Sequence, residues 1–134
     1  MFGIVVVAHG RLAEELLAAT AHVVGDQDAT AAVSIAPQED LVAKQAEVRA
    51  AVAAVDRGDG VVLVTDMFGG TPSNLAIGCM DADGVEVVYG ANLPMLVKLA
   101  KMRDRPIGEA VGCAIEAGRK YIDAASRMLA RKAC

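Results

Sequence analysis

A histidine and an aspartate each stand where an apolar run of the sequence ends. The run 3–8 (GIVVVA) is followed by His9, and the run 60–66 (GVVLVTD) ends on Asp66. A carboxylate that accepts a hydrogen bond from one ring nitrogen of a histidine fixes its tautomer and leaves the other nitrogen with a free lone pair. The carboxylate also stabilises the positive charge that develops on a phosphorylated ring. The pair is therefore a candidate carrier of a phosphoryl group, although His9 alone could equally be a structural histidine at a strand end.

The motif DMFGGTPSN, which begins at the aspartate, could hold the anion in such chemistry. Gly69 and Gly70 let backbone N–H groups approach an anion, and Thr71 can cap the following helix and donate its hydroxyl. Transfer of a phosphoryl group needs such stabilisation of its oxygens. Gly10 and Arg11, directly after the histidine, offer a weaker version of the same arrangement, and Arg11 could equally be a solvated surface residue.

Short apolar runs alternate with helical patterns along the chain. Runs that are apolar on both faces are typical of buried parallel strands, and helical spacing of apolar residues marks amphipathic helices. The predicted strands are 3–8, 29–35, 60–66 and 85–89, and the predicted helices are 12–24, 40–55, 75–80, one that begins at Pro94, and 107–116. This alternation predicts one α/β domain over residues 1–134, with an open, mostly parallel sheet and helices on both faces.

The connections of such a sheet determine where its site lies. Ligands bind beyond the carboxyl ends of the strands, where the strand order reverses, and crossovers are right-handed. We expect the strand order 2-1-3-4, in which the first strand lies between the second and the third. His9 and Asp66 then follow neighbouring strands, so the topology itself brings the imidazole and the carboxylate together.

The C-terminal stretch 119–132 (RKYIDAASRMLARK) is helical by composition. Gly118 interrupts the helical pattern before it, and residues 120–124 could instead form a short strand. The sequence does not decide between the helix and the short strand.

The composition indicates a folded protein and excludes several classes of function. Hydrophobic residues make up 54% of the chain and charged residues 22%, which is enough to build a core. The net charge of −4 offers no basic surface for nucleic acid. The three cysteines show no metal-ligand spacing, so we expect no metal, no cofactor and a reducing cytoplasm. No apolar run approaches the ~20 residues of a membrane span, so we expect no membrane insertion.

Three motifs together resemble a known family. VVVAHG, DMFGGTPSN and GANLPML (90–96) are similar, in order and spacing, to motifs of the IIA component of mannose-type sugar phosphotransferase systems, and the resemblance covers nearly the whole chain. It implies a phosphocarrier that accepts a phosphoryl group from phosphohistidine HPr and passes it to a IIB component. The family's active histidine falls on His9, its orienting aspartate on Asp66, and its phosphate-binding hydroxyl on Thr71, where serine is commoner.

The resemblance also implies the surroundings of the site. The usually aromatic position of the middle motif falls on Phe68, which would lie at the partner surface. Asn92, Leu93 and Pro94 fall on a loop that helps to wall the site.

Family members form homodimers in which a C-terminal strand, here residues 120–124, crosses to the other subunit as an antiparallel edge strand. Transport members often carry a fused IIB domain behind a Pro/Ala-rich linker, and this chain stops at Cys134 with neither. We therefore expect a single IIA domain that serves a separate IIB permease or a regulatory protein.

Other functions stay open from the sequence. Small tetrapyrrole metal chelatases resemble the N-terminus, but they need a second metal-facing histidine, and His22 on the first helix is poorly placed for that role. They also do not need the DMFGGTPSN turn. The phosphocarrier subunit of dihydroxyacetone kinase resembles the N-terminus but lacks the GGTP pattern. In a further interpretation the chain is a non-catalytic interaction module, in which phosphorylated His9 is only a signal.

Overall fold

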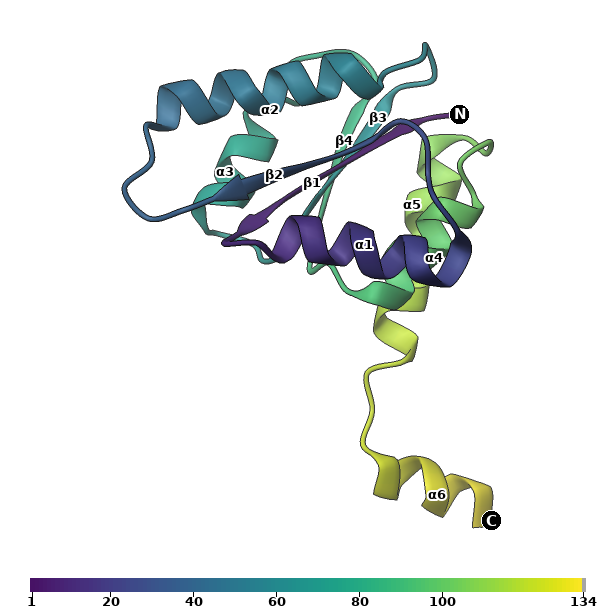
Figure 1. Ribbon diagram of the computed structural model, residues 1–134. Helices are drawn as coiled ribbons and strands as arrows, with labels where there is room; N and C mark the ends of the chain where they lie inside the picture. The colour runs from purple at the N-terminus through teal and green to yellow at the C-terminus, as the bar shows by residue number, and fades with distance from the viewer. Residues whose placement is uncertain (134) are drawn as a thin grey trace.

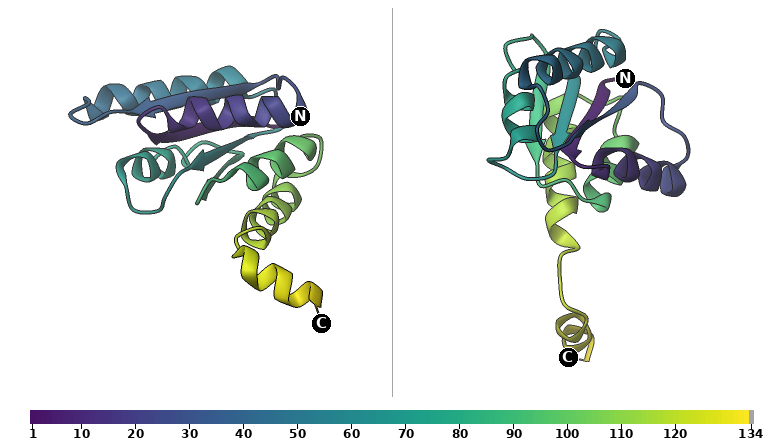
Figure 2. Two further views of the ribbon diagram at one scale, coloured as in Figure 1. Left: turned by 60° about the horizontal axis from the view of Figure 1, so that its bottom comes forward. Right: turned by 60° about the vertical axis from the view of Figure 1, so that its left-hand side comes forward.

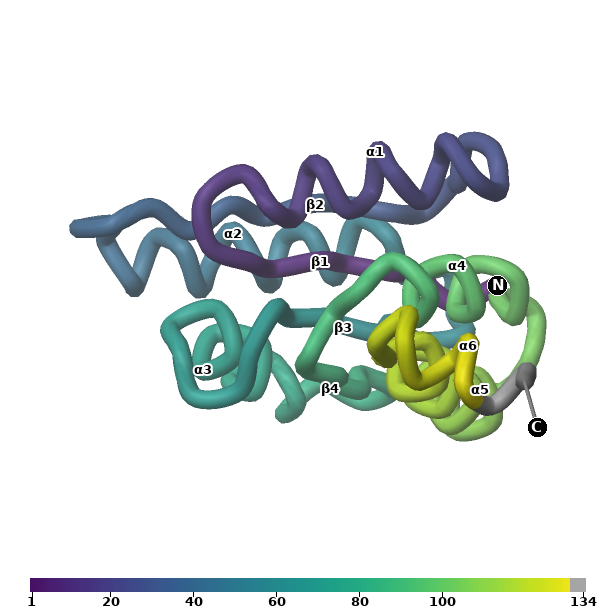
Figure 3. Tube along the Cα trace, turned by 90° about the horizontal axis from the view of Figure 1, so that it is seen from below, coloured from purple at the N-terminus to yellow at the C-terminus, as the bar shows by residue number. Residues whose placement is uncertain are grey.

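The computed structural model describes residues 1–133, and its centre is a four-stranded parallel sheet (Figure 1). The strands are β1 (Gly3–His9), β2 (Thr30–Ile35), β3 (Val61–Thr65) and β4 (Val85–Tyr89). Their order is β2-β1-β3-β4, and Figure 3 shows them side by side in that order. The predicted fold class and strand order are confirmed.

Helices cover both faces of the sheet. One face packs on α1 (Leu12–Val24), α4 (Leu93–Lys101) and α5 (Ile107–Lys120), and the other packs on α2 (Leu41–Val55) and α3 (Thr71–Ile77). The β1 side chains from Ile4 to Ala8 alternate between these two cores because successive residues of a strand point to opposite faces. The apolar run of the first strand is therefore buried on both sides, as the sequence predicted.

The register of the central strands determines which side chains lie next to each other at their carboxyl ends. β1 pairs with β3 so that Val7 lies opposite Thr65. β1 continues to His9, and Asp66 directly follows the end of β3. Both side chains therefore leave the sheet at the same edge.

Two helices, α3 and α5, differ from the sequence prediction by more than one residue at a boundary. α3 begins at Thr71 instead of 75 and ends at Ile77, because Pro72 suits the first turn of a helix and Gly70 takes the extended N-cap conformation. The helical pattern is also not interrupted at Gly118, since α5 runs through it to Lys120. A Cβ at Gly118 would lie 3.2 Å from the Cβ of Met95, so this glycine allows α4 and α5 to pack closely.

The C-terminal segment contains a helix and no fifth strand within residues 1–133. Residues 121–124 form an extended link from α5 to α6 (Ala125–Ala133). α6 stands clear of the sheet in Figure 1 and in the right-hand view of Figure 2. Its side chains Met128 and Leu129 are exposed. Cys134 lies outside the described residues.

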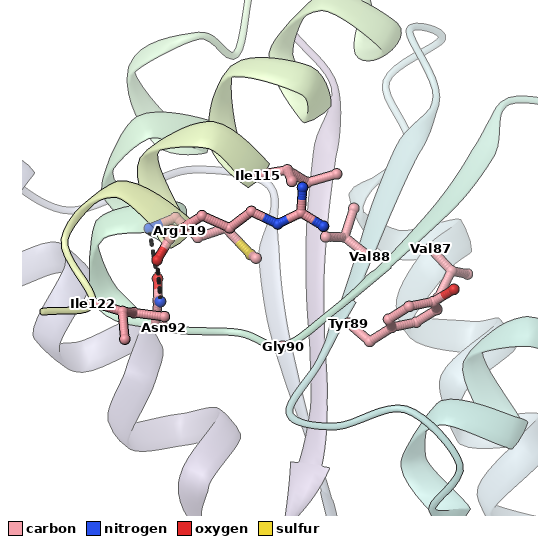
Figure 4. Close-up of a pocket in the computed structure, with 10 residues that line it drawn as sticks. Val87, Val88, Tyr89, Gly90, Asn92, Ile115, Arg119 and Ile122 are labelled. Atoms are coloured by element: carbon pink, nitrogen blue, oxygen red, sulfur yellow. Dashed lines mark hydrogen bonds between the residues drawn. The ribbon is translucent and has the colours of Figure 1, made fainter.

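A groove runs beside β4, which is an edge strand of the sheet. Its volume is about 310 Å³, and Val88, Ile115, Arg119 and Ile122 are among the residues that line it. Figure 4 shows the Arg119 side chain extending across Val88 on this side of the strand. The outer edge of β4 has no strand partner within the described chain, and such edges are available for pairing.

Candidate functional site

Hydrogen bonds join His9 and Asp66 at the carboxyl edge of the sheet. The Asp66 Oδ2 atom accepts from the backbone N–H of His9 at 2.9 Å and lies 2.7 Å from the ring atom Nδ1. The other carboxylate oxygen accepts from the N–H of Met67 at 2.9 Å. The carboxylate side chain is only 10% exposed, whereas the imidazole is 50% exposed. The structure thus holds the carboxylate firmly and presents the ring to solvent.

This contact lowers the pKa of Asp66 and selects the tautomer of the neutral His9 ring. Burial alone would raise the pKa of Asp66, but the hydrogen bonds from the backbone and ring of His9 more than offset it, so the pKa of Asp66 lies below its ordinary value. The ionised carboxylate can only accept, so Nδ1 of His9 carries the donated proton. The second ring nitrogen, Nε2, is left with its lone pair.

The glycine turn of the DMFGGTPSN motif passes beside this free nitrogen. A Cβ built on Gly70 would lie 3.1 Å from Cε1 and 3.5 Å from Nε2 of His9. Gly69 has φ +90°, a conformation that favours glycine. Asn74 makes the first backbone bond of α3, to the Gly70 carbonyl. The N–H groups of Thr71 and Ser73 precede that bond and have no acceptor inside the helix.

An open cavity of about 490 Å³ lies on one side of the ring. His9, Gly10 and Thr71 line it, together with the loop between β2 and α2, residues 35–39. The Thr71 residue is therefore placed at the same cavity as the imidazole. The cavity is large enough for a phosphoryl group and is open to solvent on its outer side.

The residues directly after the histidine have other partners. The Gly10 N–H donates to the Ile35 carbonyl at 2.9 Å, which continues the pairing of β1 with β2. Arg11 is exposed and lies 3.7 Å from Glu14 and 3.9 Å from Glu15 along α1. In this structure Gly10 shapes the turn after the histidine, and Arg11 balances acidic side chains on the first helix.

Apolar side chains are exposed in the turn that follows Asp66. Phe68 is 66% exposed, and its ring centroid lies 4.9 Å from that of Tyr89 at the end of β4. Met67 is also exposed. Exposed apolar residues beside a reactive group are typical of a surface that binds another protein.

The predicted wall residues of the GANLPML motif serve mainly the packing of helices. Asn92 caps α4 by accepting from the N–H of Met95, and its Nδ2 donates to the Gly118 carbonyl at 2.9 Å. Leu93 and Pro94 form the first turn of α4. Asn92 lines the groove beside β4, and the structure does not bring it to the cavity at His9.

Sequence reasoning missed the cavity residues Pro37, Gln38 and Glu39 and the aromatic partner Tyr89. A general signal was available, because each of these residues lies at or just beyond the carboxyl end of a parallel strand. Gln38 has φ +63°, a conformation that few residues other than glycine adopt, and nothing in the sequence marked it.

The described residues, 1–133, contain no group of three or more His, Cys, Asp or Glu side chains that could hold a metal ion. In the same part of the chain no helix is long and apolar enough to cross a bilayer.

Comparison with known proteins identifies the family of proteins to which this fold belongs. The protein-family model described as "PTS system fructose IIA component" matches residues 3–115. The "PTS system mannose-specific EIIAB component" of Escherichia coli K12 is 33% identical over 124 residues, which are 90% of this chain and 38% of that relative. The chain therefore belongs to the mannose-type IIA family of the sugar phosphotransferase system, and it spans well under half of the curated relatives it matches.

Solved structures show the same fold. The mannose/sorbose-specific IIA subunit from Enterococcus faecalis has a TM-score of 0.82 and 29% identity, covering 92% of this chain and 93% of that one. The phosphotransferase component EIIA from Streptococcus agalactiae has a TM-score of 0.85 at 21% identity, covering 95% and 99%.

The tautomer of His9 gives a direct test of the contact with Asp66. In wild type at about pH 9, where imidazole is neutral, ¹⁵N NMR should show the proton on Nδ1. In Asp66→Ala the acceptor is gone, so the proton should move largely to Nε2. His22, on α1, is the internal control and should not change. A His9 ring that keeps its proton on Nδ1 in the variant would contradict the assignment.

Proposed function

We propose that this chain is a phosphocarrier of a mannose-type phosphotransferase system, in which Nε2 of His9 accepts a phosphoryl group from phosphorylated HPr and passes it to a IIB component. Membership of the IIA family supports phosphotransfer in sugar uptake in general. The observation that carries the finer proposal is the contact between Nδ1 of His9 and Asp66. It leaves Nε2 free beside the glycine turn.

The transfer step follows from this geometry. The Nε2 lone pair attacks the phosphorus in line, the N–P bond of the donor phosphohistidine breaks, and its electron pair returns to the donor ring. A new N–P bond forms on Nε2, and the ring gains positive charge. The ionised Asp66, whose oxygen lies 2.7 Å from Nδ1, stabilises that charge. The same steps in reverse direction pass the group to a nucleophile of the IIB component.

The glycine turn and Thr71 would hold the oxygens of the transferred group. Gly70 lies beside the ring, since a Cβ at this position would be 3.1 Å from Cε1 and 3.5 Å from Nε2, and the N–H of Thr71 has no acceptor in its helix. Thr71 also lines the cavity beside the ring, so its hydroxyl could donate to a phosphoryl oxygen. Gly10 would contribute the shape of the turn, because its own N–H is already bound to Ile35.

The exposed apolar side chains around the ring suit protein partners. Met67 and Phe68 are exposed in the turn that follows Asp66, and Leu41 is an exposed residue at the cavity that His9 lines. HPr and the IIB component would dock on this surface in turn. Arg11 and its acidic neighbours would lie at the rim of the same surface.

The carrier role is tested by intact mass after incubation with phosphoenolpyruvate, enzyme I and HPr. Wild type and the control His22→Ala should gain one acid-labile phosphoryl group, and His9→Ala should gain none. A wild-type chain that gains no mass with donors shown to be active, or a His9→Ala chain that still gains one, would defeat the proposal.

The closeness of Gly70 to the ring gives a steric test of the glycine turn. Gly70 has φ −93°, which alanine can adopt, so Gly70→Ala should fold normally. The added Cβ would lie 3.1 Å from Cε1 of His9 and push the ring away from the turn, so transfer should slow on the order of 10²-fold, the cost of a ~1 Å misplacement. The matched control is Gly112→Ala on α5, where a Cβ meets nothing within 4 Å. Equal transfer rates in the two variants would remove the turn from the site.

The homodimer is a second part of the proposal. The unpaired edge of β4, the groove beside it and the exposed extended link 121–124 support an exchange of C-terminal segments between two chains. The link of one chain would pair with β4 of the other.

Light scattering on two truncated chains tests this exchange. A chain that ends at Lys120 lacks the link and should be a monomer, whereas a chain that ends at Ala124 lacks only α6 and should stay a dimer. A dimer that survives in the shorter chain would show that the link is not the exchanged element.

A further inference from the structure

The segment between Asp66 and α3 carries Gly70, which lies beside the free nitrogen of His9. Its first residue is fixed by hydrogen bonds to His9, and its last leads into the helix at Thr71. Between them lie two glycines, and glycine leaves the backbone more conformations than any other residue. The turn therefore needs a further contact if Gly70 is to stay within reach of Nε2.

The ring contact between Phe68 and Tyr89 supplies such a support. The centroids lie 4.9 Å apart and the ring planes are tilted by 51°, within the range that aromatic pairs prefer. Phe68 precedes the glycines directly, so its position limits theirs. The ring of Phe68 is otherwise largely in solvent.

Tyr89 is well placed to act as the fixed half of this pair. It is the last residue of β4 and lies opposite Thr65, the last residue of β3. Tyr89 is among the residues that line the groove beside β4, and Figure 4 shows its ring beside Val87, directed away from Arg119. Val87 belongs to the core that includes α3, so Tyr89 lies on the face of the sheet where the glycine turn enters that helix.

We propose that Tyr89 is a positioning residue for phosphoryl transfer: its ring holds Phe68, and Phe68 holds the glycine turn against Nε2 of His9. This inference rests on the proposed phosphocarrier function. It assigns to Tyr89 a role in the chemistry at His9 that does not require contact with a protein partner.

A donor without a docking surface separates positioning from partner binding. Phosphoramidate can phosphorylate the imidazole directly: its N–P bond breaks, a bond from Nε2 to phosphorus forms, and ammonia leaves after taking up a proton. With this donor, Tyr89→Ala should be phosphorylated on the order of 10-fold more slowly than wild type, because the turn is displaced. Tyr89→Phe keeps the ring and should match wild type. Val23→Ala, which truncates an exposed apolar side chain near the C-terminal end of α1, is the matched control.

The route through Phe68 is tested by a double-mutant cycle. If Tyr89 acts only through that ring, the variant Phe68→Ala with Tyr89→Ala should be no slower with phosphoramidate than Phe68→Ala alone. Additive losses would overturn the route. A Tyr89→Ala chain that is slow with phosphorylated HPr but normal with phosphoramidate would make Tyr89 a docking residue and overturn the proposal.

The ¹⁵N relaxation order parameters of Gly69 and Gly70 give a readout that needs no phosphorylation. They should be lower in Tyr89→Ala than in wild type and unchanged in Tyr89→Phe, with urea unfolding as a check on global stability. Unchanged order parameters in Tyr89→Ala would overturn the positioning role. If wild type takes no phosphoryl group from either donor, the carrier function fails, and the order parameters still decide whether Tyr89 holds the turn.

Discussion

Asp66 can accept two hydrogen bonds from His9 because β1 and β3 are neighbours that run in the same direction. Their register sets Val7 opposite Thr65, so the residues that follow leave the sheet together. A shift of one residue would turn each β1 side chain to the opposite face, and the imidazole would no longer meet the carboxylate. The register is held by valines that are fully buried between two layers of helices. The chemistry at the edge thus depends on apolar packing in the middle of the sheet.

The Asp66 carboxylate and the His9 imidazole differ in burial, and this difference fits the role of each group in the pair. The Asp66 side chain is almost covered, so water cannot compete for it, while half of the imidazole remains accessible. Covering a carboxylate is costly unless donors replace its water. Here the donors are His9 itself and the N–H of Met67, and they hold the pKa of Asp66 below its ordinary value. His9, the residue that Asp66 orients, therefore supplies most of the stabilisation of the Asp66 carboxylate.

The strands, their order and the meeting of His9 with Asp66 follow from sequence because each depends on local patterns and one topological rule. The start of α3 also had a local signal, because Pro72 suits the first turn of a helix, and the sequence prediction of that boundary did not use it. The course of α5 through Gly118 did not follow from sequence, since it depends on a contact with distant residues: Gly118 fits against α4. The same limit hid Arg103, which is buried although charged, and which donates to the carbonyls of Phe2 and Ala29 at the amino edge of the sheet. It also hid Tyr89, whose partner lies in a turn.

Tyr89 also connects the site to the free edge of the sheet. It ends β4, and the preceding residue, Val88, lines the groove on the opposite face of that strand. A second chain paired along β4 would satisfy the exposed backbone groups of the strand and restrict its motion up to Tyr89. Because the ring of Tyr89 contacts Phe68, that restriction would reach the glycine turn beside His9. Pairing at the edge and order of the glycine turn beside His9 would then favour each other, without any contact between the second chain and the imidazole.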